Sequence, residues 1–314
     1  MNYKRIGLIT FSVLIVFSFA FYGISKNGKE LKVETPTDEI IAYDNVLATP
    51  PIPQTVTFCG ESVPIDIYYV REGLERELII HCYQHSRTIQ TFKRSTRFFP
   101  EIEKILKEEG LPEDLKYLCV AESSLENVVS PAKAAGFWQF MAATGRSYGL
   151  EINEYVDERY HLEKSTRAAC AFLKDLKSKL GTWSLAAAAY NMGETGLQRN
   201  INEQSINNYW DLFLNQETSR YVNRIISYKL MFEDPEKYGV HLKVTECYRP
   251  IPYKEVSVDS TINNLFDFAR TNNILYRELK EMNPWLRDKM LPVKGKRYVI
   301  RIPEKTKSRY EDLF

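Results

Sequence analysis

The sequence predicts a mainly helical protein that ends in a small β-α-α-β module. Three observations support this fold class. Between about Gly73 and Pro235, apolar residues recur at intervals of three and four, the spacing of amphipathic helices. An alanine-rich apolar run over 183–190 indicates a buried central helix. After a boundary at Pro250-Ile251-Pro252, two strand-like segments flank two helical ones.

The composition indicates a globular protein of about two domains. The chain has 314 residues, of which 44% are hydrophobic and 26% charged. We place the helical domain at 73–247 and the C-terminal module at 248–314.

The net charge of +1 argues against a nucleic-acid partner. No phosphate-binding or dinucleotide-binding motif occurs, and His81 and His85 have no evident third ligand, so we expect no cofactor and no metal.

The N-terminus carries the features of a targeting segment. Lys4 and Arg5 precede an uncharged run over Ile6–Ile24, which is close to the length that crosses a bilayer. We expect residues 1–25 to be a signal peptide or a membrane anchor that is not cleaved. Basic residues before the span predict that the rest of the chain is exported, to the periplasm or the cell envelope. Residues 26–72, rich in proline, are expected to form a linker and an N-terminal arm.

The individual elements follow from the apolar pattern and its stop signals. A weakly alternating stretch over 55–65 suggests a short strand or an arm, and Gly110 and Pro112 separate two of the helices. The helices expected in the main domain span about 73–92, 97–109, 115–122, 165–180, 183–190 and 217–232. In the module we expect strands over 255–258 and 296–303 and helices over 262–271 and 275–282.

Glu122 is the strongest candidate for a catalytic residue. In a helix, Leu115, Leu118, Cys119 and Glu122 share one face, which places a carboxylate on an apolar stripe. Burial disfavours the charged form and raises the pKa, as a general acid near neutral pH requires. A solvated glutamate at a frayed helix end is the alternative, since most glutamates are exposed.

The residues after Glu122 suggest a carbohydrate site. Ser123, Ser124 and Ser130 are polar, and the aromatic run Gly136–Met141 contains a single amide, Gln139. One acid, a polar turn and an aromatic wall together suit a sugar ligand. The two aromatic residues before Gln139 are expected in the core, because buried aromatics dominate cores, whereas an amide among aromatics needs hydrogen-bond partners.

Four separated segments add a family resemblance. They are Glu122-Ser123, then Ser130-Pro131 with Ala135-Gly136-Phe137-Trp138-Gln139-Phe140-Met141, then Ala189-Tyr190-Asn191-Met192-Gly193, and finally Glu217-Thr218-Ser219-Arg220-Tyr221-Val222. In this order they resemble the motifs of the family 1 lytic transglycosylases, in the group of membrane-bound lytic murein transglycosylase D. The similarity covers about residues 55–240. Ala142, Met192 and Glu126-Asn127 depart from the family's usual proline, small residue and Asn-Pro.

The resemblance implies a lysozyme-like fold and a reaction that needs one carboxylate. Glu122 would protonate the glycosidic oxygen of a MurNAc–GlcNAc bond in peptidoglycan. It would then act as a base while the MurNAc 6-hydroxyl attacks its own anomeric carbon, giving a 1,6-anhydro-MurNAc end. Ordinary glycoside hydrolysis uses a pair of carboxylates instead. The resemblance makes Glu217 a structural or site-shaping residue.

The same resemblance implies a set of substrate-binding residues with distinct roles. Ser130 and Gln139 would bind N-acetyl groups, and Tyr221 would place its hydroxyl near the carboxylate. Tyr190 would form a wall of the groove, and Asn191 would orient Glu122 or bind the glycan. The expected substrate-binding residues are Ser123, Ser130, Gln139, Tyr190, Asn191 and Tyr221.

The C-terminal module resembles LysM, a peptidoglycan-binding repeat. Val258-Asp259-Ser260-Thr261 is similar to its usual start, and Asn283-Pro284 to the segment after its second helix. The implied partners are peptidoglycan strands and, through the N-terminal segment, the envelope membrane. A module that only caps the fold is an alternative. For the whole chain, a hydrolytic muramidase and a non-catalytic peptidoglycan-binding scaffold remain open alternatives.

Overall fold

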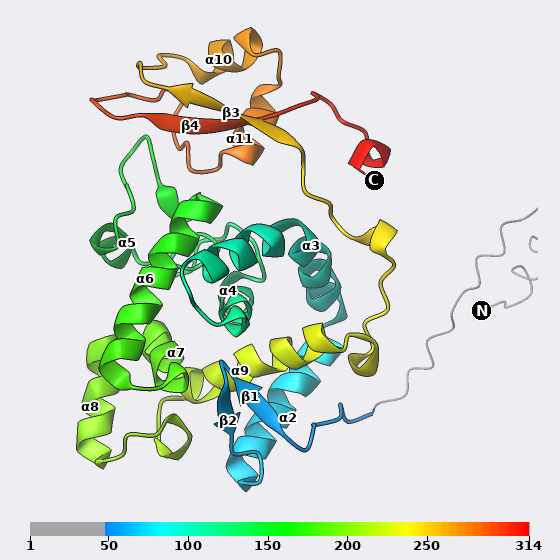
Figure 1. The fold of residues 1–314 in the computed structure, drawn as a ribbon, viewed down its shortest axis with the longest axis vertical. Helices are drawn as coiled ribbons and strands as arrows, with labels where there is room; N and C mark the ends of the chain where they lie inside the picture. Colours follow the sequence, from blue (N-terminus) through cyan, green and yellow to red (C-terminus); the bar gives the residue numbers. More distant parts are fainter. Residues whose placement is uncertain (1–47, 314) are drawn as a thin grey trace, which may run out of the picture. The chain divides into compact units, whose positions relative to one another are not determined.

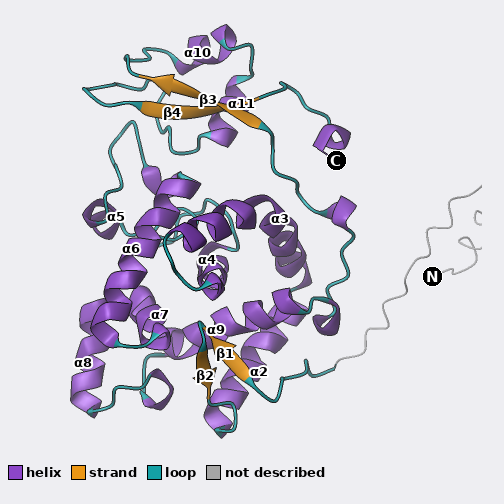
Figure 2. Ribbon diagram, in the orientation of Figure 1, coloured by secondary structure: helices purple, strands orange, loops and turns teal. Residues whose placement is uncertain are grey.

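Helices dominate residues 48–313, the part of the chain that the computed structural model describes (Figures 1 and 2). Two antiparallel two-stranded sheets accompany them, so the mainly helical class expected from the sequence is confirmed. The expected targeting segment over 1–25 and the first part of the linker lie outside the described residues. Within 48–313, no helix combines the length and the apolar character needed to cross a bilayer.

The N-terminal arm is a β-hairpin that belongs to the folded body. β1 (Val56–Phe58) pairs with β2 (Glu61–Val63), and the two residues of the turn both have positive φ. Phe58 is fully buried in the main core. The Glu61 carboxylate accepts hydrogen bonds from backbone N–H groups at the start of the helix α7 (Trp183–Met192). A carboxylate at this end of a helix is favourable, so the arm stabilises a central helix.

The next helix, α2 (Tyr68–Tyr83), begins five residues before the expected start at Gly73. Gly73 lies inside α2 and does not mark its start. Its missing side chain lets α2 pack closely on a neighbouring helix. A Cβ atom added there would approach Asn223 Nδ2 to 2.7 Å, on the helix α9 (Gln216–Glu233). The sequence pattern could not distinguish a glycine needed for packing from one that marks a boundary.

The break between the first two helices also differs from the expectation. α3 (His85–Glu108) is continuous over 24 residues. The break expected between a helix over 73–92 and a helix over 97–109 was therefore wrong. The chain turns at Gln84, which has φ −83° and ψ 56°. Pro100 lies inside α3 although it cannot donate a backbone hydrogen bond. Nothing in the residue types at Gln84 signals the break, whereas Pro100 signals one that does not occur.

The central helices pack around the small side chains of α7. The middle of the helical domain consists of α4 (Lys116–Ser123), α6 (Leu162–Leu180) and α7. Along the chain, α8 (Glu194–Gln204) and α9 follow. A short helix, α5 (Ala142–Ser147), precedes α6. The four alanines of α7 are completely buried, so the expected buried central helix is confirmed. Small side chains let α6 and α9 pack closely on α7, next to the end of α4.

A buried ion-pair cluster joins α2 to α9. The Glu77 side chain is 1% exposed, with Oε1 2.6 Å from Arg220 Nε and Oε2 3.7 Å from Arg224 Nε. We expect Glu77→Gln to lower the free energy of unfolding by about 3 kcal/mol, because it leaves guanidinium charges without their buried partner. Urea denaturation measures the change. Glu72→Gln on the exposed face of α2 is the control, and equal stability of the two variants would contradict the structural role of Glu77.

The C-terminal module has the expected β-α-α-β order. Its elements are β3 (Tyr253–Val258), α10 (Leu265–Thr271), α11 (Tyr276–Met282) and β4 (Tyr298–Pro303). The strands are antiparallel, with Val256 opposite Ile300. Alternate residues of β4 are buried while Val299 is 42% exposed, as the two-residue period of a strand requires.

The module shares its core with the helical domain. Its buried cluster includes Ala135, Val156 and Tyr160 from the loops around α5, and Asp157 N donates to Trp285 O at 2.9 Å. One buried cluster thus contains residues from both of the expected domains. The domain bounds 73–247 and 248–314 stay a prediction.

Candidate active site

Glu122 lies next to the last residue of α4 and lines a cavity of about 360 Å³. The following residues, Ser123 and Ser124, are 5% and 3% exposed, so this helix end is buried rather than frayed. Ser124 and Leu125 both have left-handed backbone conformations, with φ of 54° and 60°. Such conformations are uncommon outside glycine and often occur at functional sites. The chain thus makes a sharp turn directly after the candidate acid.

The environment of Glu122 favours its protonated form. Burial raises the pKa of its carboxyl group to about 7, and the Glu217 carboxylate adds to the increase. The Tyr221 hydroxyl, which donates a hydrogen bond to Glu122 Oε1, and the charge of Arg224 act in the opposite direction. Tyr221 is 1% exposed, and burial raises its own pKa, so it remains a donor. A carboxyl group balanced near pH 7 can both give and take a proton.

The cavity has a polar wall that sequence reasoning missed. Eight residues line it: Ser86, Arg87, Gln90, Glu122, Ser123, Ser124, Glu126 and Val128. The first three lie in the first turns of α3, and Arg87 Nε donates to Ser124 Oγ at 2.8 Å. The two partners are 37 residues apart, and no local pattern connects them. Only the packing of α3 beside the end of α4 brings them together.

Three of the expected site residues lie in or beside the turns that follow Glu122. Ser123 lines the cavity, and its Oγ donates to Cys119 O at 3.3 Å. Ser130 Oγ accepts a hydrogen bond from Ala134 N and so stabilises a turn of its own. Gln139 has φ 47°, and its Nε2 donates to Val128 O at 3.0 Å and to a second backbone carbonyl at 2.8 Å. The amide therefore has the partners that its surroundings require, and it holds Val128 at the cavity.

Tyr190 and Asn191 lie at the end of α7. The Tyr190 hydroxyl donates to Trp138 O at 2.7 Å. Asn191 Nδ2 donates to Glu217 Oε1 at 3.3 Å, and its Oδ1 accepts from Thr218 Oγ1 at 2.9 Å. Glu122 is not among the hydrogen-bond partners of Asn191 in residues 48–313. Asn191 thus joins α7 to the first turn of α9, which carries Tyr221 one turn further on.

The aromatic residues before Gln139 belong to the core, as expected. Trp138 is fully buried and Phe137 is 4% exposed. Trp138 Nε1 donates to Thr166 Oγ1 at 2.8 Å, so its polar atom is satisfied within α6. Neither side chain lines the cavity beside Glu122.

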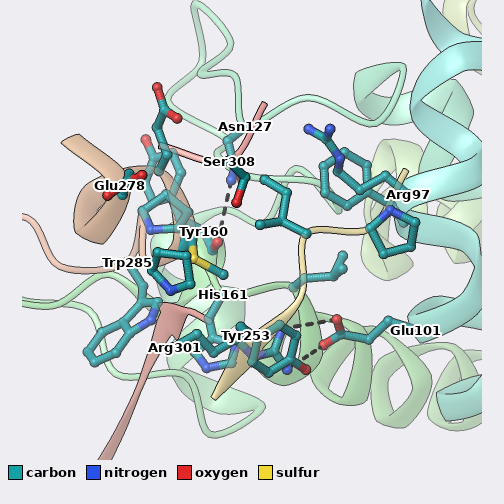
Figure 3. A pocket seen from close by; sticks show the side chains of 18 of the residues that line it. Arg97, Glu101, Asn127, Tyr160, His161, Tyr253, Glu278, Trp285, Arg301 and Ser308 are labelled. Atoms are coloured by element: carbon teal, nitrogen blue, oxygen red, sulfur yellow. Dashed lines mark hydrogen bonds and ion pairs between the residues drawn. The ribbon is translucent and has the colours of Figure 1, made fainter. Parts of the chain in front are cut away.

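A larger cavity of about 510 Å³ lies where the module meets the helical domain (Figure 3). Arg301 spans it, with both terminal nitrogens bonded to Glu101 at 2.9 and 3.0 Å and its guanidinium over the Tyr253 ring. None of the expected site residues lines this cavity. Asn127 does, whereas its neighbours Glu126 and Val128 line the smaller cavity, so a single loop separates the two. The candidate active site is the smaller cavity, because it contains Glu122.

Comparison with known protein families gives two matches in this chain. Residues 99–213 match the family model described as Transglycosylase SLT domain. Residues 254–306 match the model described as Soluble lytic transglycosylase C-terminal LysM-like domain. The chain therefore carries a transglycosylase SLT domain followed by a LysM-like domain, which confirms the resemblance drawn from its motifs. Glu122, Gln139 and Asn191 fall within the first match, whereas Arg87 and Tyr221 lie outside it.

Three curated relatives are similar to the chain. Membrane-bound lytic murein transglycosylase D of Escherichia coli (strain K12) is 29% identical over 242 residues, which are 75% of this chain and 52% of the relative. The protein of the same name from Escherichia coli O6:H1 gives the same values. A protein of Alteromonas sp. (strain M-1) named for tributyltin chloride resistance is 32% identical over 116 residues, 35% of this chain and 56% of the relative. The chain spans about half the length of the curated relatives it matches.

Proposed function

We propose that the chain is a lytic transglycosylase that cleaves the MurNAc-β-1,4-GlcNAc bond of peptidoglycan. The SLT domain and the similarity to membrane-bound lytic murein transglycosylase D support the reaction class. The observation that carries the proposal is Glu122. Its carboxyl group lines a cavity, has a pKa near 7 and accepts a hydrogen bond from Tyr221. A glycan-binding scaffold has no need of a carboxyl group held in this state.

In the proposed reaction, Glu122 acts first as an acid and then as a base. It donates its proton to the glycosidic oxygen as the bond from that oxygen to C1 of MurNAc breaks. Its carboxylate then takes the proton of the MurNAc 6-hydroxyl while O6 forms the new bond to C1. The products are a 1,6-anhydro-MurNAc end and a GlcNAc with a free 4-hydroxyl. Glu122 regains its proton, so neither water, a metal nor a cofactor is consumed.

The neighbouring residues have proposed roles in binding the glycan. Gln139 uses its Nε2 to hold the loop, which leaves Oε1 to accept a hydrogen bond from an N-acetyl N–H. Ser123 lines the cavity. We assign Ser130 to the edge of this cavity, beyond the residues that line it. Tyr190 and Asn191 would form the opposite wall. Asn191 acts on the site through Glu217, whose charge raises the pKa of Glu122.

A hydrolytic muramidase is the main alternative to this proposal. Such an enzyme needs a second carboxylate in addition to Glu122. Glu126 lines the same cavity, but Arg94 pairs with it, and Glu217 accepts from Asn191. Mass spectrometry of muropeptides released from sacculi tests the proposal. We expect 1,6-anhydro products from the wild type and from Glu126→Gln. Reducing MurNAc ends that disappear in Glu126→Gln would support the hydrolase, and binding without release would support the scaffold.

The proposed acid predicts a pH dependence. Because Glu122 must be protonated to donate, activity is retained below its pKa and is lost as the pH rises through about 7. The Tyr221 hydrogen bond stabilises the carboxylate and lowers that pKa. We therefore expect Tyr221→Phe to move the alkaline limb of the kcat/KM profile to higher pH. A limb that stays in place, or moves lower, would contradict this role for Tyr221.

We also propose an envelope location and a glycan-binding role for the LysM-like domain. The expected export segment over 1–25 supports the location, which fractionation of cells that express the full chain would check. The matched LysM-like domain supports contact with peptidoglycan. Its shared core with Val156 and Tyr160 equally suits a structural cap. Sacculus binding by the full chain carrying substitutions on the exposed face of this domain separates the two.

A further inference from the structure

One wall of the cavity beside Glu122 lies outside the segment that matches the SLT model. Ser86, Arg87 and Gln90 come from the first turns of α3, whereas the match begins at residue 99. These side chains are exposed, polar and directed to the same cavity as the candidate acid. The chemistry of this wall is therefore a property of the site that the matched domain does not supply.

Arg87 is the cation in this wall, and no ion pair with another described residue compensates its charge. Its Nε is held by Ser124 Oγ at 2.8 Å, and its two terminal nitrogens have no hydrogen-bond or ion-pair partner among residues 48–313. Arg94, two turns further along α3, differs because it donates to Gln90 Oε1 at 2.8 Å and pairs with Glu126. Glu126, which also lines the cavity, therefore has Arg94 as its ion-pair partner. The cavity thus presents one open guanidinium group beside Glu122.

An anchored guanidinium with two free N–H-bearing nitrogens is suited to bind a carboxylate in a bidentate manner. If the proposed function holds, the substrate provides such groups, because peptide stems attached to MurNAc carry free carboxylates. The neighbouring hydroxyl of Ser86 and amide of Gln90 suit the peptide groups of the same stem. We propose that Arg87 forms a subsite for a carboxylate of the peptide stem on the muramic acid residue that is cleaved.

Steady-state cleavage of two soluble glycan-strand substrates tests the proposal. One carries native peptide stems, and in the other the stem carboxylates have been converted to methyl amides. We expect Arg87→Gln to raise KM on the native strands by roughly tenfold, as the loss of a charge-assisted hydrogen bond implies, with little change in kcat. On the amidated strands, the variant and the wild type should have equal KM. Lys104→Gln, which removes a 74% exposed cation from the same helix, is the control for net charge.

Each outcome decides the question. Equal KM of Arg87→Gln and wild type on native strands would overturn the proposal. So would an equal loss on both substrates, because Arg87 would then act only by holding Ser124. A third substrate of stem-free strands, which carry the lactyl carboxylate alone, identifies the source of the charge, and a tenfold loss there would exclude the stem. If the wild type releases no anhydro products from any strand, the proposed function itself fails.

Discussion

Glu122→Gln is expected to lower the rate of glycan cleavage by about a thousandfold, the usual contribution of a positioned general acid and base. The amide keeps the shape of the side chain and can still accept a hydrogen bond from Tyr221. It cannot donate a proton to the glycosidic oxygen or take one from the 6-hydroxyl. Release of muropeptides from sacculi measures the rate, and binding of the variant to sacculi should be largely unchanged.

A matched control lies in the same cavity. Glu126→Gln also removes one carboxylate from the lining, but that carboxylate is 42% exposed and is paired with Arg94. We expect this variant to stay within a few-fold of the wild type. Activity of Glu122→Gln at the level of Glu126→Gln would end the assignment of Glu122 as the acid.

Gly136→Ala should have the largest effect on stability, lowering the free energy of unfolding by about 4 kcal/mol or more. Gly136 has φ +83°, and a Cβ atom there would lie 1.8 Å from the backbone carbonyl oxygen of Arg159. A backbone atom cannot move aside as the end of a flexible side chain can. The turn that carries Gln139 would have to separate from the segment before α6. Chemical denaturation gives the change directly.

Gly149→Ala separates crowding from backbone strain. Gly149 has a similar φ of +87°, but no heavy atom lies within 4 Å of its added Cβ. Its substitution should therefore cost only the left-handed conformation, about 1 kcal/mol. If Gly136→Ala were no more destabilising than Gly149→Ala, the close contact between Gly136 and Arg159 would not be a feature of the folded protein.

Much of the fold could be predicted from the sequence, because regular spacing is a local property. The alanine-rich run correctly predicted the buried helix α7. The strand and helix patterns after Pro252 correctly predicted the order of the elements in the C-terminal module. The errors have a common origin in tertiary packing. Gly73 fits α2 against α9, and the chain breaks at Gln84 without any turn-forming residue. Only the neighbouring elements determine these two features.

The candidate site shows the same division. The helical face of Leu115, Cys119 and Glu122 by itself indicates a carboxyl group in apolar surroundings. The Tyr221 hydroxyl that reaches it comes from 99 residues further along the chain, and the family resemblance suggested it where spacing could not. Neither route pointed to Arg87, because its position depends on how α3 lies beside the end of α4.

In the reaction that we propose, the sugar's own 6-hydroxyl, and not a water molecule, forms the new bond to the anomeric carbon. Digestion of sacculi by the full chain in water enriched in oxygen-18 tests this most directly, with the released muropeptides examined by mass spectrometry. We expect 1,6-anhydro ends that contain no oxygen from the solvent. One solvent oxygen incorporated at each newly formed MurNAc end would contradict it.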